Sequence, residues 1–226
     1  MRESERMEQT VLGERYIACG SSGGLYPLRG TPGNALGAYL DGAEIELFGN
    51  AQDATGDTMN AGTITIHGNT GDAAGYAMRG GSIYVRGDAG YRAGIHMKAY
   101  GDTVPALVIG GRAGSFLGEY QAGGIILVLG LGCAPGAAPV GCFCGTGMHG
   151  GRIYLRTETL PADLPEQVAA RRATQEDMRL IAPYLDRFCE KFHMDKTTDL
   201  GGNYYVLSPN EKSPYRMLYV YNWGQP

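Results

Sequence analysis

The sequence lacks any apolar run long enough to cross a membrane. Its longest strongly apolar run covers residues 125–129, whereas a membrane helix needs about 20 residues. The first five residues, MRESE, carry too much charge for a signal peptide. Together these absences predict a cytoplasmic protein that does not partner a membrane.

Cysteine and net charge are also scarce. Five cysteines are an odd number in a chain of 226 residues. Because a chain of that length can bury a substantial core, we expect free thiols in a reducing compartment rather than a disulfide framework. A formal net charge of −4 gives no basis for binding nucleic acid or an anionic membrane surface.

Glycine is the residue in excess. The chain has 37 glycines but only 11 prolines, and the collagen triplet is absent. So many glycines without that triplet indicate a turn geometry that recurs along the chain.

A repeat of 19 residues accounts for this recurrence. Seven strand-like segments, the first six of which end at a glycine, begin at Tyr26, Ile45, Ile64, Ile83, Leu107, Ile126 and Ile153. Four of the six steps between these positions equal 19 residues. The other two steps, of 24 and 27 residues, carry insertions of five and eight residues around positions 98–105 and 133–144. Such a period predicts repeated coils of one structure.

Glycines also keep a constant phase after these segments. Four copies of the repeat have three glycines at spacings of three and four residues: Gly30/Gly33/Gly37, Gly68/Gly71/Gly75, Gly87/Gly90/Gly94 and Gly111/Gly114/Gly118. A further copy has Gln52 between Gly49 and Gly56. A glycine held at one phase marks either a bend with positive φ or a place where a Cβ does not fit.

Alternating polarity within the segments predicts strands. The first and third residues are apolar, as in Ile64 and Ile66, which places both on one face of a strand. Stacked coils would pair equivalent strands in parallel about 4.8 Å apart, around one continuous core. The predicted fold class is therefore an all-β parallel solenoid. An antiparallel sandwich is the alternative, but it does not explain the constant phase of the glycines.

The residues between the inward pairs face outward and change along the rod. In order they are Glu46, Thr65, Tyr84, Val108, Leu127 and Tyr154. The last four form an apolar stripe, and such a stripe marks an interface or lies beneath another element. Two covers are available, the chain's own C-terminal helix and a partner chain. We expect the helix, because only a short linker separates it from Tyr154.

The C-terminal third has a different texture. Pro161 and Pro165 mark a linker, and the sequence TQED at residues 174–177 is a capping box. A helix is predicted over residues 174–194, and Pro183 should kink it or divide it in two. Its apolar stripe is Met178, Ile181, Leu185, Phe188 and Phe192.

Two segments near the end, residues 204–207 and 218–221, are rich in Tyr, Val and Leu and predict extended structure. The predicted organisation is a β-helix domain at residues 1–160. Residues 161–226 then supply a linker, an amphipathic helix and an extended tail packed on the solenoid as a cap.

Residues 145–150 spell G-x-G-x-x-G, the pattern of dinucleotide-binding turns. The binding mechanism requires a helix after the motif, whose N-terminus takes the pyrophosphate. A strand-like segment follows at residues 152–155 instead. We therefore interpret these glycines as a turn of the solenoid.

The candidate metal ligands are Cys133, Cys142 and Cys144, with His149 close behind. Zinc sites usually use C-x-x-C pairs, which Cys-x-Cys matches poorly. We interpret the three cysteines as thiols without a metal; the insertion that carries them could instead contact a partner.

Three further histidines, His67, His96 and His193, stand singly. No carboxylate pair or Ser/His/Asp order accompanies them. The sequence therefore predicts no catalytic, cofactor-binding or metal-binding residue in this chain.

Three segments carry a family resemblance: GNALGAYL at residues 33–40, GGSIYVRG at 80–87 and GMHGGRIYL at 147–155. The run from about residue 15 to residue 160 resembles the GXGXG domain at the C-terminus of the glutamate synthase large subunit. One of the subunits of formylmethanofuran dehydrogenase shares the same repeat.

The resemblance implies a right-handed parallel β-helix with a supporting role. In glutamate synthase, an amidotransferase domain releases ammonia from glutamine, and a domain with FMN and an iron–sulfur cluster uses it to aminate 2-oxoglutarate reductively. The β-helix joins those domains and has no catalytic residue of its own.

By this resemblance the chain is a scaffold subunit in glutamate biosynthesis and nitrogen assimilation. The implied partners are an amidotransferase subunit and an FMN-binding synthase subunit, and FMN and the iron–sulfur cluster would lie on these partners. The sequence leaves open whether the chain also forms a homo-oligomer. A formylmethanofuran-dehydrogenase-like complex is the alternative. A free-standing carbohydrate-active or metal-binding protein is a third, although Glu46 is the one acid among the six outward residues.

Overall fold

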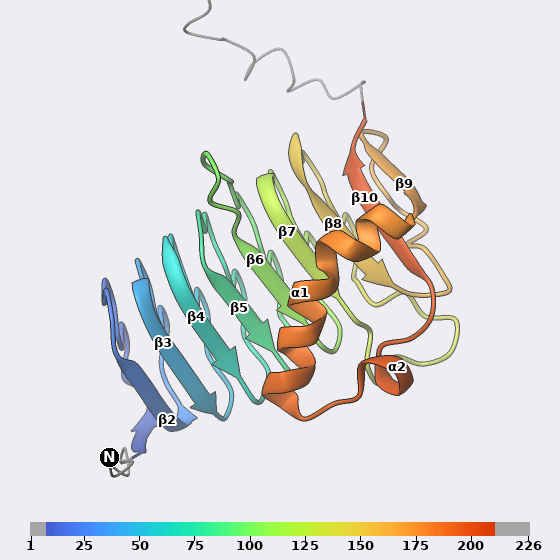
Figure 1. Ribbon diagram of the computed structural model, residues 1–226. Coiled ribbons are helices and arrows are strands. Elements are labelled where there is room, and N and C mark those ends of the chain that lie inside the picture. The colour runs from blue at the N-terminus through green and yellow to red at the C-terminus, as the bar shows by residue number, and fades with distance from the viewer. Residues whose placement is uncertain (1–7, 211–226) are drawn as a thin grey trace, which may run out of the picture.

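The structure is a computed structural model, which describes residues 8–210. The extended segment predicted at residues 218–221 lies outside this range. Parallel strands stand side by side in chain order, and one helix lies across the later strands (Figure 1). The fold is the predicted solenoid.

The strands form one sheet. Its parallel members are β1 (Gln9–Leu12), β2 (Leu25–Thr31), β3 (Asp41–Phe48), β4 (Ala61–Ile66), β5 (Ser82–Val85), β6 (Ala106–Ile109), β7 (Ala122–Val128) and β8 (Gly150–Arg156). Two antiparallel strands close the C-terminal end: β10 (Tyr204–Pro209) pairs with β8, and β9 (Val168–Arg172) pairs with β10. Parallel pairing of the repeated strands excludes the sandwich.

The observed register is the one predicted from the repeat. Ile45 pairs with Ile64, Ile64 with Ile83, and so on through Leu107, Ile126 and Ile153. These side chains are at most 1% exposed. Each buried aliphatic side chain lies against its counterparts in the neighbouring coils, so the core runs the length of the rod.

Two strands were not predicted. β1 precedes the first glycine-phased copy and pairs in parallel with β2. β9 lies in the segment expected to be a linker, and its residues after Val168 are exposed. Because β9 takes its strand character from β10, more than 30 residues later in the chain, no local pattern identifies it.

The turns alternate between left-handed residues and others. Ala35, Gly37 and Tyr39 all have φ between 56° and 65°. The N–H groups of Ala35 and Tyr39 donate to the next coil, at 2.9 Å and 2.7 Å, and that of Gly37 donates to Ile17 of the preceding coil, at 2.9 Å. The turns are therefore hydrogen-bonded from coil to coil, as the strands are.

The glycine in the middle of this turn is explained by the direction in which its side chain would point, which is into the core. A Cβ on Gly37 would lie 2.7 Å from Cδ1 of Ile64 and 3.0 Å from Cδ1 of Ile45, inside the core. Tyr39 has the same backbone conformation, yet 54% of it is exposed. At position 37 glycine is required because the left-handed residue faces the core.

Close approach explains the glycines just after β4 and β5, Gly68 and Gly87. Oδ1 of Asn50 accepts the N–H of Asn69 at 2.8 Å, and Oδ1 of Asn69 accepts the N–H of Asp88 at 2.8 Å. Cβ atoms on Gly68 and Gly87 would collide with those oxygens, and the φ angle of neither glycine is left-handed. Both explanations left open by the sequence therefore hold, each at its own phase of the repeat.

Helix α1 (Gln175–Phe192) begins at the predicted capping box, with Thr174 as N-cap and Asp177 completing the reciprocal bond. Pro183 lies inside one continuous helix, which bends at mid-length but is not divided (Figure 1). A short helix, α2 (Lys196–Asp199), follows. Within residues 8–210, no helix combines the length and apolar character needed to cross a bilayer.

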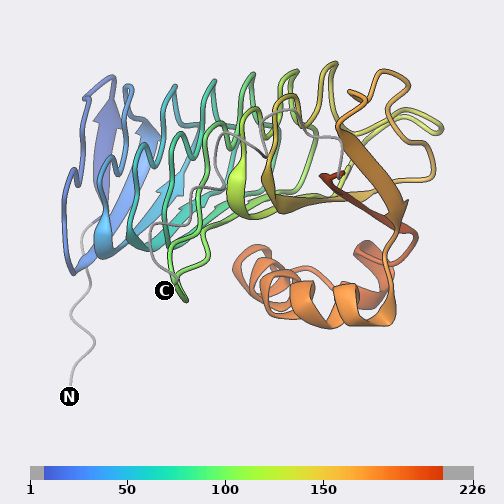
Figure 2. The same cartoon turned by 90° about the horizontal axis from the view of Figure 1, so that it is seen from above.

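The apolar stripe lies under α1, as expected. Tyr84, Val108, Leu127 and Tyr154 are at most 4% exposed. They form a second core with α1, which lies along one side of the row of coils (Figure 2). The residues of the helix in this core are Ile181, Leu185, Phe188, Cys189 and Phe192, with Met178 partly buried beside them.

Asp177 fastens α1 to the end of the solenoid. Its carboxylate is 3% exposed, lies 3.0 Å from Nη2 of Arg171 on β9 and 3.7 Å from Nη1 of Arg152 on β8, and accepts the Thr174 N–H at 2.8 Å. The Arg171 guanidinium, and then the bonds from Thr174, hold the pKa of Asp177 well below its ordinary value of 3.8.

Replacing Gly37 by alanine should destabilise the fold. We expect Gly37→Ala to lower the free energy of unfolding by about 1–3 kcal/mol, because the new Cβ enters the core from a left-handed backbone. Tyr39→Ala is the control, since it places alanine in the same conformation facing solvent. Urea unfolding followed by circular dichroism measures the free energy of unfolding of both variants. Equal losses of stability in the two would contradict the conclusion that position 37 needs glycine because it faces the core.

Because α1 covers the apolar stripe, a charge placed at Leu127 should strongly reduce the stability of the fold. The substitution Leu127→Asp should lower the free energy of unfolding of the isolated chain by about 3 kcal/mol or more, because an unpaired carboxylate enters an apolar contact. Leu12→Asp makes the same change at a leucine that is 83% exposed and should melt almost as the wild type does. A normal melting temperature for Leu127→Asp would show that α1 does not cover the stripe.

Asp177 predicts a dependence of stability on pH. Since its pKa is depressed in the folded chain, its contribution is complete above the ordinary carboxyl pKa and is lost as pH falls below about 4. We expect Asp177→Asn to cost about 1–2 kcal/mol at pH 7, and the gap between wild type and variant to narrow towards pH 2. Denaturant titrations across this range test it, and a gap independent of pH would refute the assignment.

Candidate functional site

The first insertion builds a small hairpin at the edge where the strands begin, the upper edge in Figure 1. Tyr100 and Thr103 exchange backbone hydrogen bonds of 3.1 Å and 3.0 Å across a two-residue turn. Thr103 packs closely on the backbone at Gly80, where a Cβ would lie 2.5 Å from its Cγ2. The solenoid repeat does not need this hairpin, and segments of that kind often carry function.

The hairpin walls one of two adjoining hollows. The larger, of about 490 Å³, is lined by Asn60, Arg79, Lys98, Tyr100 and Thr103. The smaller, of about 360 Å³, is lined by His96, Lys98, Tyr120, Ala122 and His149. We call the residues around the two hollows, which share Lys98, the basic edge.

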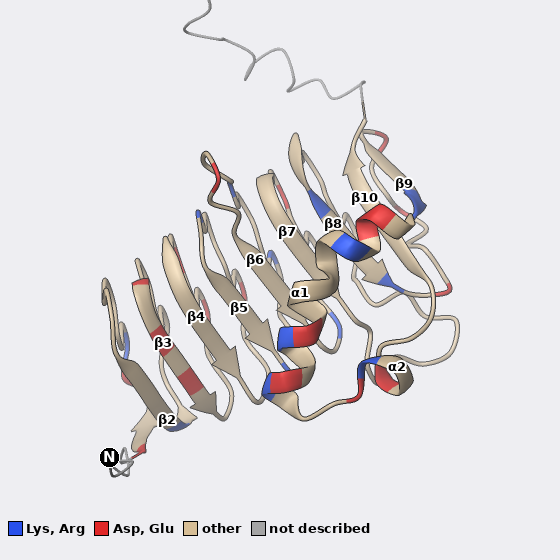
Figure 3. Cartoon of the chain, viewed as in Figure 1, with Lys and Arg blue, Asp and Glu red and all other residues tan. Residues whose placement is uncertain are grey.

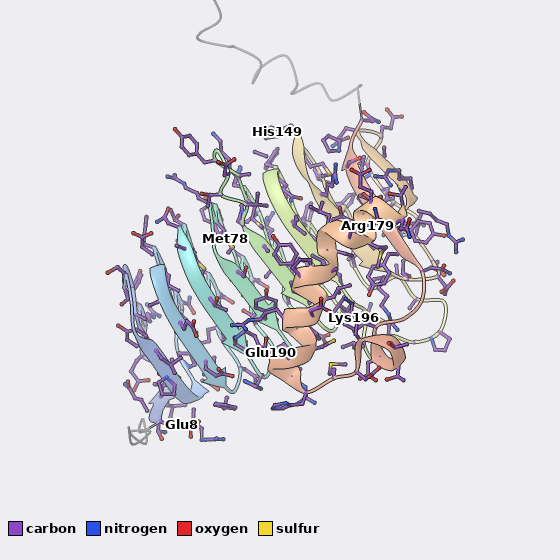
Figure 4. All side chains as sticks on the ribbon, in the orientation of Figure 1. Glu8, Met78, His149, Arg179, Glu190 and Lys196 are labelled. Carbon is purple, nitrogen blue, oxygen red and sulfur yellow. The ribbon has the colours of Figure 1, made fainter. Side chains whose placement is uncertain are left out.

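Backbone hydrogen bonds align part of the basic edge in one column. Arg79 donates to the carbonyl of Met59 at 2.8 Å, and Lys98 to that of Met78 at 3.0 Å. In each case the acceptor is the residue just before the one that holds the donor's position in the preceding coil: Met59 precedes Asn60, and Met78 precedes Arg79. Asn60, Arg79, Lys98, Ala122 and His149 therefore follow one another at about 4.8 Å per coil. Figure 4 shows His149 at the start of β8, on this edge.

Among the described residues, the positive charge of Arg79 and Lys98 on the basic edge is not neutralised by an ion pair. Within residues 8–210, Arg79 and Lys98 make no ion pair and no side-chain hydrogen bond, whereas Arg92 pairs with Glu119 at 3.0 Å. No Asp or Glu of the described chain lines either hollow. The arrangement suits the binding of an anion.

Aromatic rings flank these cations. His96 stacks on Tyr120 with ring centroids 5.2 Å apart, and Tyr76 meets His96 edge-on at 5.9 Å. Tyr100 is 80% exposed at the hairpin. Exposed rings beside cations are typical of surfaces that bind other molecules.

The three candidate metal-ligating cysteines lie in different environments. Cys144 is buried in the core, and burial raises the pKa of its thiol to about 12. Cys142 is exposed, and a hydrogen bond with Asp163 raises its pKa. Cys133 is half-buried in the wall of a separate hollow of about 240 Å³. In the described part of the chain, no three His, Cys, Asp or Glu residues converge as metal ligands.

The G-x-G-x-x-G sequence forms a turn, as interpreted. Gly145 and Gly147 have left-handed φ angles of 74° and 69°, and the chain continues directly into β8 rather than into a helix. No helix N-terminus is available here to receive a pyrophosphate.

The histidines are less isolated than the sequence indicated. Nε2 of His67 lies 2.8 Å from Oε1 of Glu46, one coil away, and its ring stacks on Phe48. His96 belongs to the basic edge, whereas His193 closes α1 as its C-cap. The sequence predicted no carboxylate partner for His67; the partner is 21 residues away and meets it through the coil register.

Sequence reasoning also missed the basic edge. Two signals were available: the step of 19 residues from Asn60 to Arg79 and to Lys98, and the insertion that directly follows Lys98. Reading the repeat at every phase, rather than at its strands and glycines alone, would have placed these side chains in one column.

Comparison with known proteins gives the same assignment as the fold. The model of the GXGXG motif family matches residues 7–210. An uncharacterised protein of the archaeon Methanocaldococcus jannaschii is 46% identical over 220 residues, which cover 94% of this chain and 84% of that protein. The chain therefore belongs to the GXGXG family, the family of the C-terminal domain of glutamate synthase.

Proposed function

We propose that this protein is a non-catalytic scaffold subunit of a glutamate-synthase-type enzyme. In such an enzyme partner chains hydrolyse glutamine and aminate 2-oxoglutarate reductively, with FMN and an iron–sulfur cluster on the partners. The proposal assigns the chain to glutamate biosynthesis, nitrogen assimilation and the cytoplasm. The family match over residues 7–210 carries it.

The construction of the rod supports a scaffold role. Strands and turns are both hydrogen-bonded from coil to coil, so the surfaces keep a fixed spacing along the axis. Helix α1 occupies the β5–β8 half of one face of the sheet, and within residues 8–210 no helix covers the edges or the turns. A rigid body with several separate faces can hold two larger subunits in a constant relative position.

The isolated chain should have no activity of its own. We expect purified protein neither to release ammonia from glutamine nor to retain FMN, because the proposal assigns both to partner chains. The Cys142 thiol beside Asp163 has a raised pKa, whereas an activated thiol nucleophile has a lowered one. Ammonia assays and absorbance spectra measure this. Stoichiometric flavin, or glutaminase turnover abolished by a single substitution in this chain, would contradict the scaffold proposal.

A reconstitution tests the positive half of the proposal. Adding this chain to an amidotransferase subunit and an FMN-containing synthase subunit should increase glutamate formation from glutamine and 2-oxoglutarate. Replacing glutamine by ammonia is the control, since ammonia needs no transfer between subunits. Stable assembly with a formylmethanofuran-dehydrogenase-type enzyme, but not with these subunits, would favour the alternative.

A further inference from the structure

We propose that the basic edge is the docking surface for an acidic, extended segment of a partner subunit. The inference rests on the proposed function, which requires partner subunits. It adds the place and the chemistry of one contact.

Within residues 8–210 no element covers the basic edge, whereas half of the broad sheet face is covered. Helix α1 lies over the β5–β8 half of that face, away from the edge where the strands begin (Figures 1 and 2). Arg79, His96, Lys98 and Tyr100 are all exposed. A partner could reach these side chains without displacing any described element.

Charge identifies the chemistry of the partner. The chain has a net charge of −4, and several of its acids lie along β3 (Figure 3). On the basic edge itself Asp102 lies in the turn of the hairpin, but it does not line either hollow. Arg79 and Lys98 occupy successive coils, so their backbones are about 4.8 Å apart and the two charges repel each other. Neither has a counter-ion within residues 8–210. Carboxylates of a partner would relieve that repulsion.

Length favours a chain segment over a small anion. From Asn60 to His149 the column passes through four coil steps, roughly 19 Å at 4.8 Å per step. An extended peptide rises about 3.3 Å per residue, so about six residues would span the basic edge. A single dicarboxylate would fill only one of the two hollows.

The walls of the site are preformed. The hairpin is closed by its two backbone bonds and held by the contact of Thr103 with Gly80, and the His96–Tyr120 stack fixes the second hollow. A surface that needs little ordering loses less free energy on binding. Tyr100 and Tyr120 offer apolar contact beside the cations, a combination enriched at interfaces.

A fluorescently labelled hexaglutamate peptide provides a direct test with the full chain. In low-salt buffer its anisotropy should rise saturably with protein, and hexalysine should not bind. The double variant Arg79→Glu/Lys98→Glu should weaken binding by at least about tenfold. The matched control is Arg86→Glu/Arg112→Glu, which makes the same charge change at exposed arginines beyond the other ends of the strands and should weaken it by less than about threefold.

The outcomes distinguish a docking surface for an acidic peptide from general electrostatic attraction and from a site for a small dicarboxylate. Absence of saturable hexaglutamate binding to the wild type would overturn the proposal, as would equal losses in the two double variants, which would indicate only general electrostatics. Displacement of the peptide by millimolar glutamate or 2-oxoglutarate would assign the hollows to a small dicarboxylate instead. Circular dichroism and melting curves confirm that both variants are folded.

Reconstitution with the partner subunits separates this proposal from the proposed function. If the wild type and the Arg86→Glu/Arg112→Glu variant assemble but the Arg79→Glu/Lys98→Glu variant does not, both proposals hold. If all three assemble equally, the basic edge is not the docking surface although the scaffold role stands. If none assembles while hexaglutamate still binds at Lys98, the partner is acidic but belongs to another enzyme.

Discussion

Hydrogen bonding between successive coils in one fixed register is the interaction on which the rest of the molecule depends. It acts through the parallel strands and again through the turns, where N–H groups donate alternately to the next and the preceding coil. Every side chain is therefore held beside its counterpart. In the core the register places isoleucine against isoleucine. At the strand ends it places an asparagine oxygen where it accepts a backbone N–H of the next coil. At the basic edge it places Arg79 beside Lys98. A slip of one residue would turn the whole core outward.

That dependence explains why the sequence predicted so much of the fold. Ile45, Ile64 and Ile83 recur at the same phase, and a periodic core admits one register. Helix α1 was predictable for a local reason, because its capping box and apolar stripe are encoded within the segment itself. The antiparallel cap has neither kind of signal: β9 contains Arg171 and Arg172, and it becomes a strand only because β10 returns to lie beside it.

The candidate site was less predictable, for a different reason. Arg79 and Lys98 lie in different coils, and only the folded register makes them neighbours. His67 and Glu46 meet in the same way, 21 residues apart. Sequence periodicity indicates which residues share a column, but the direction of each side chain and the folding of the hairpin at Tyr100 decide whether a column becomes a surface.

The two ends of the rod differ in how they are closed. At one end β10 and β9 extend the sheet in antiparallel fashion, and Asp177 joins α1 to both β8 and β9. At the other end β1 has four residues and, within residues 8–210, pairs only with β2. In a linear stack each coil is stabilised by its neighbours, so a coil with one neighbour opens at the lowest free energy. Fraying should therefore start at β1 and advance coil by coil. The coils of β5–β8, which carry α1 and most of the basic edge, would be the last to open. The basic edge would therefore keep its shape while the β1 end of the rod opens and closes locally.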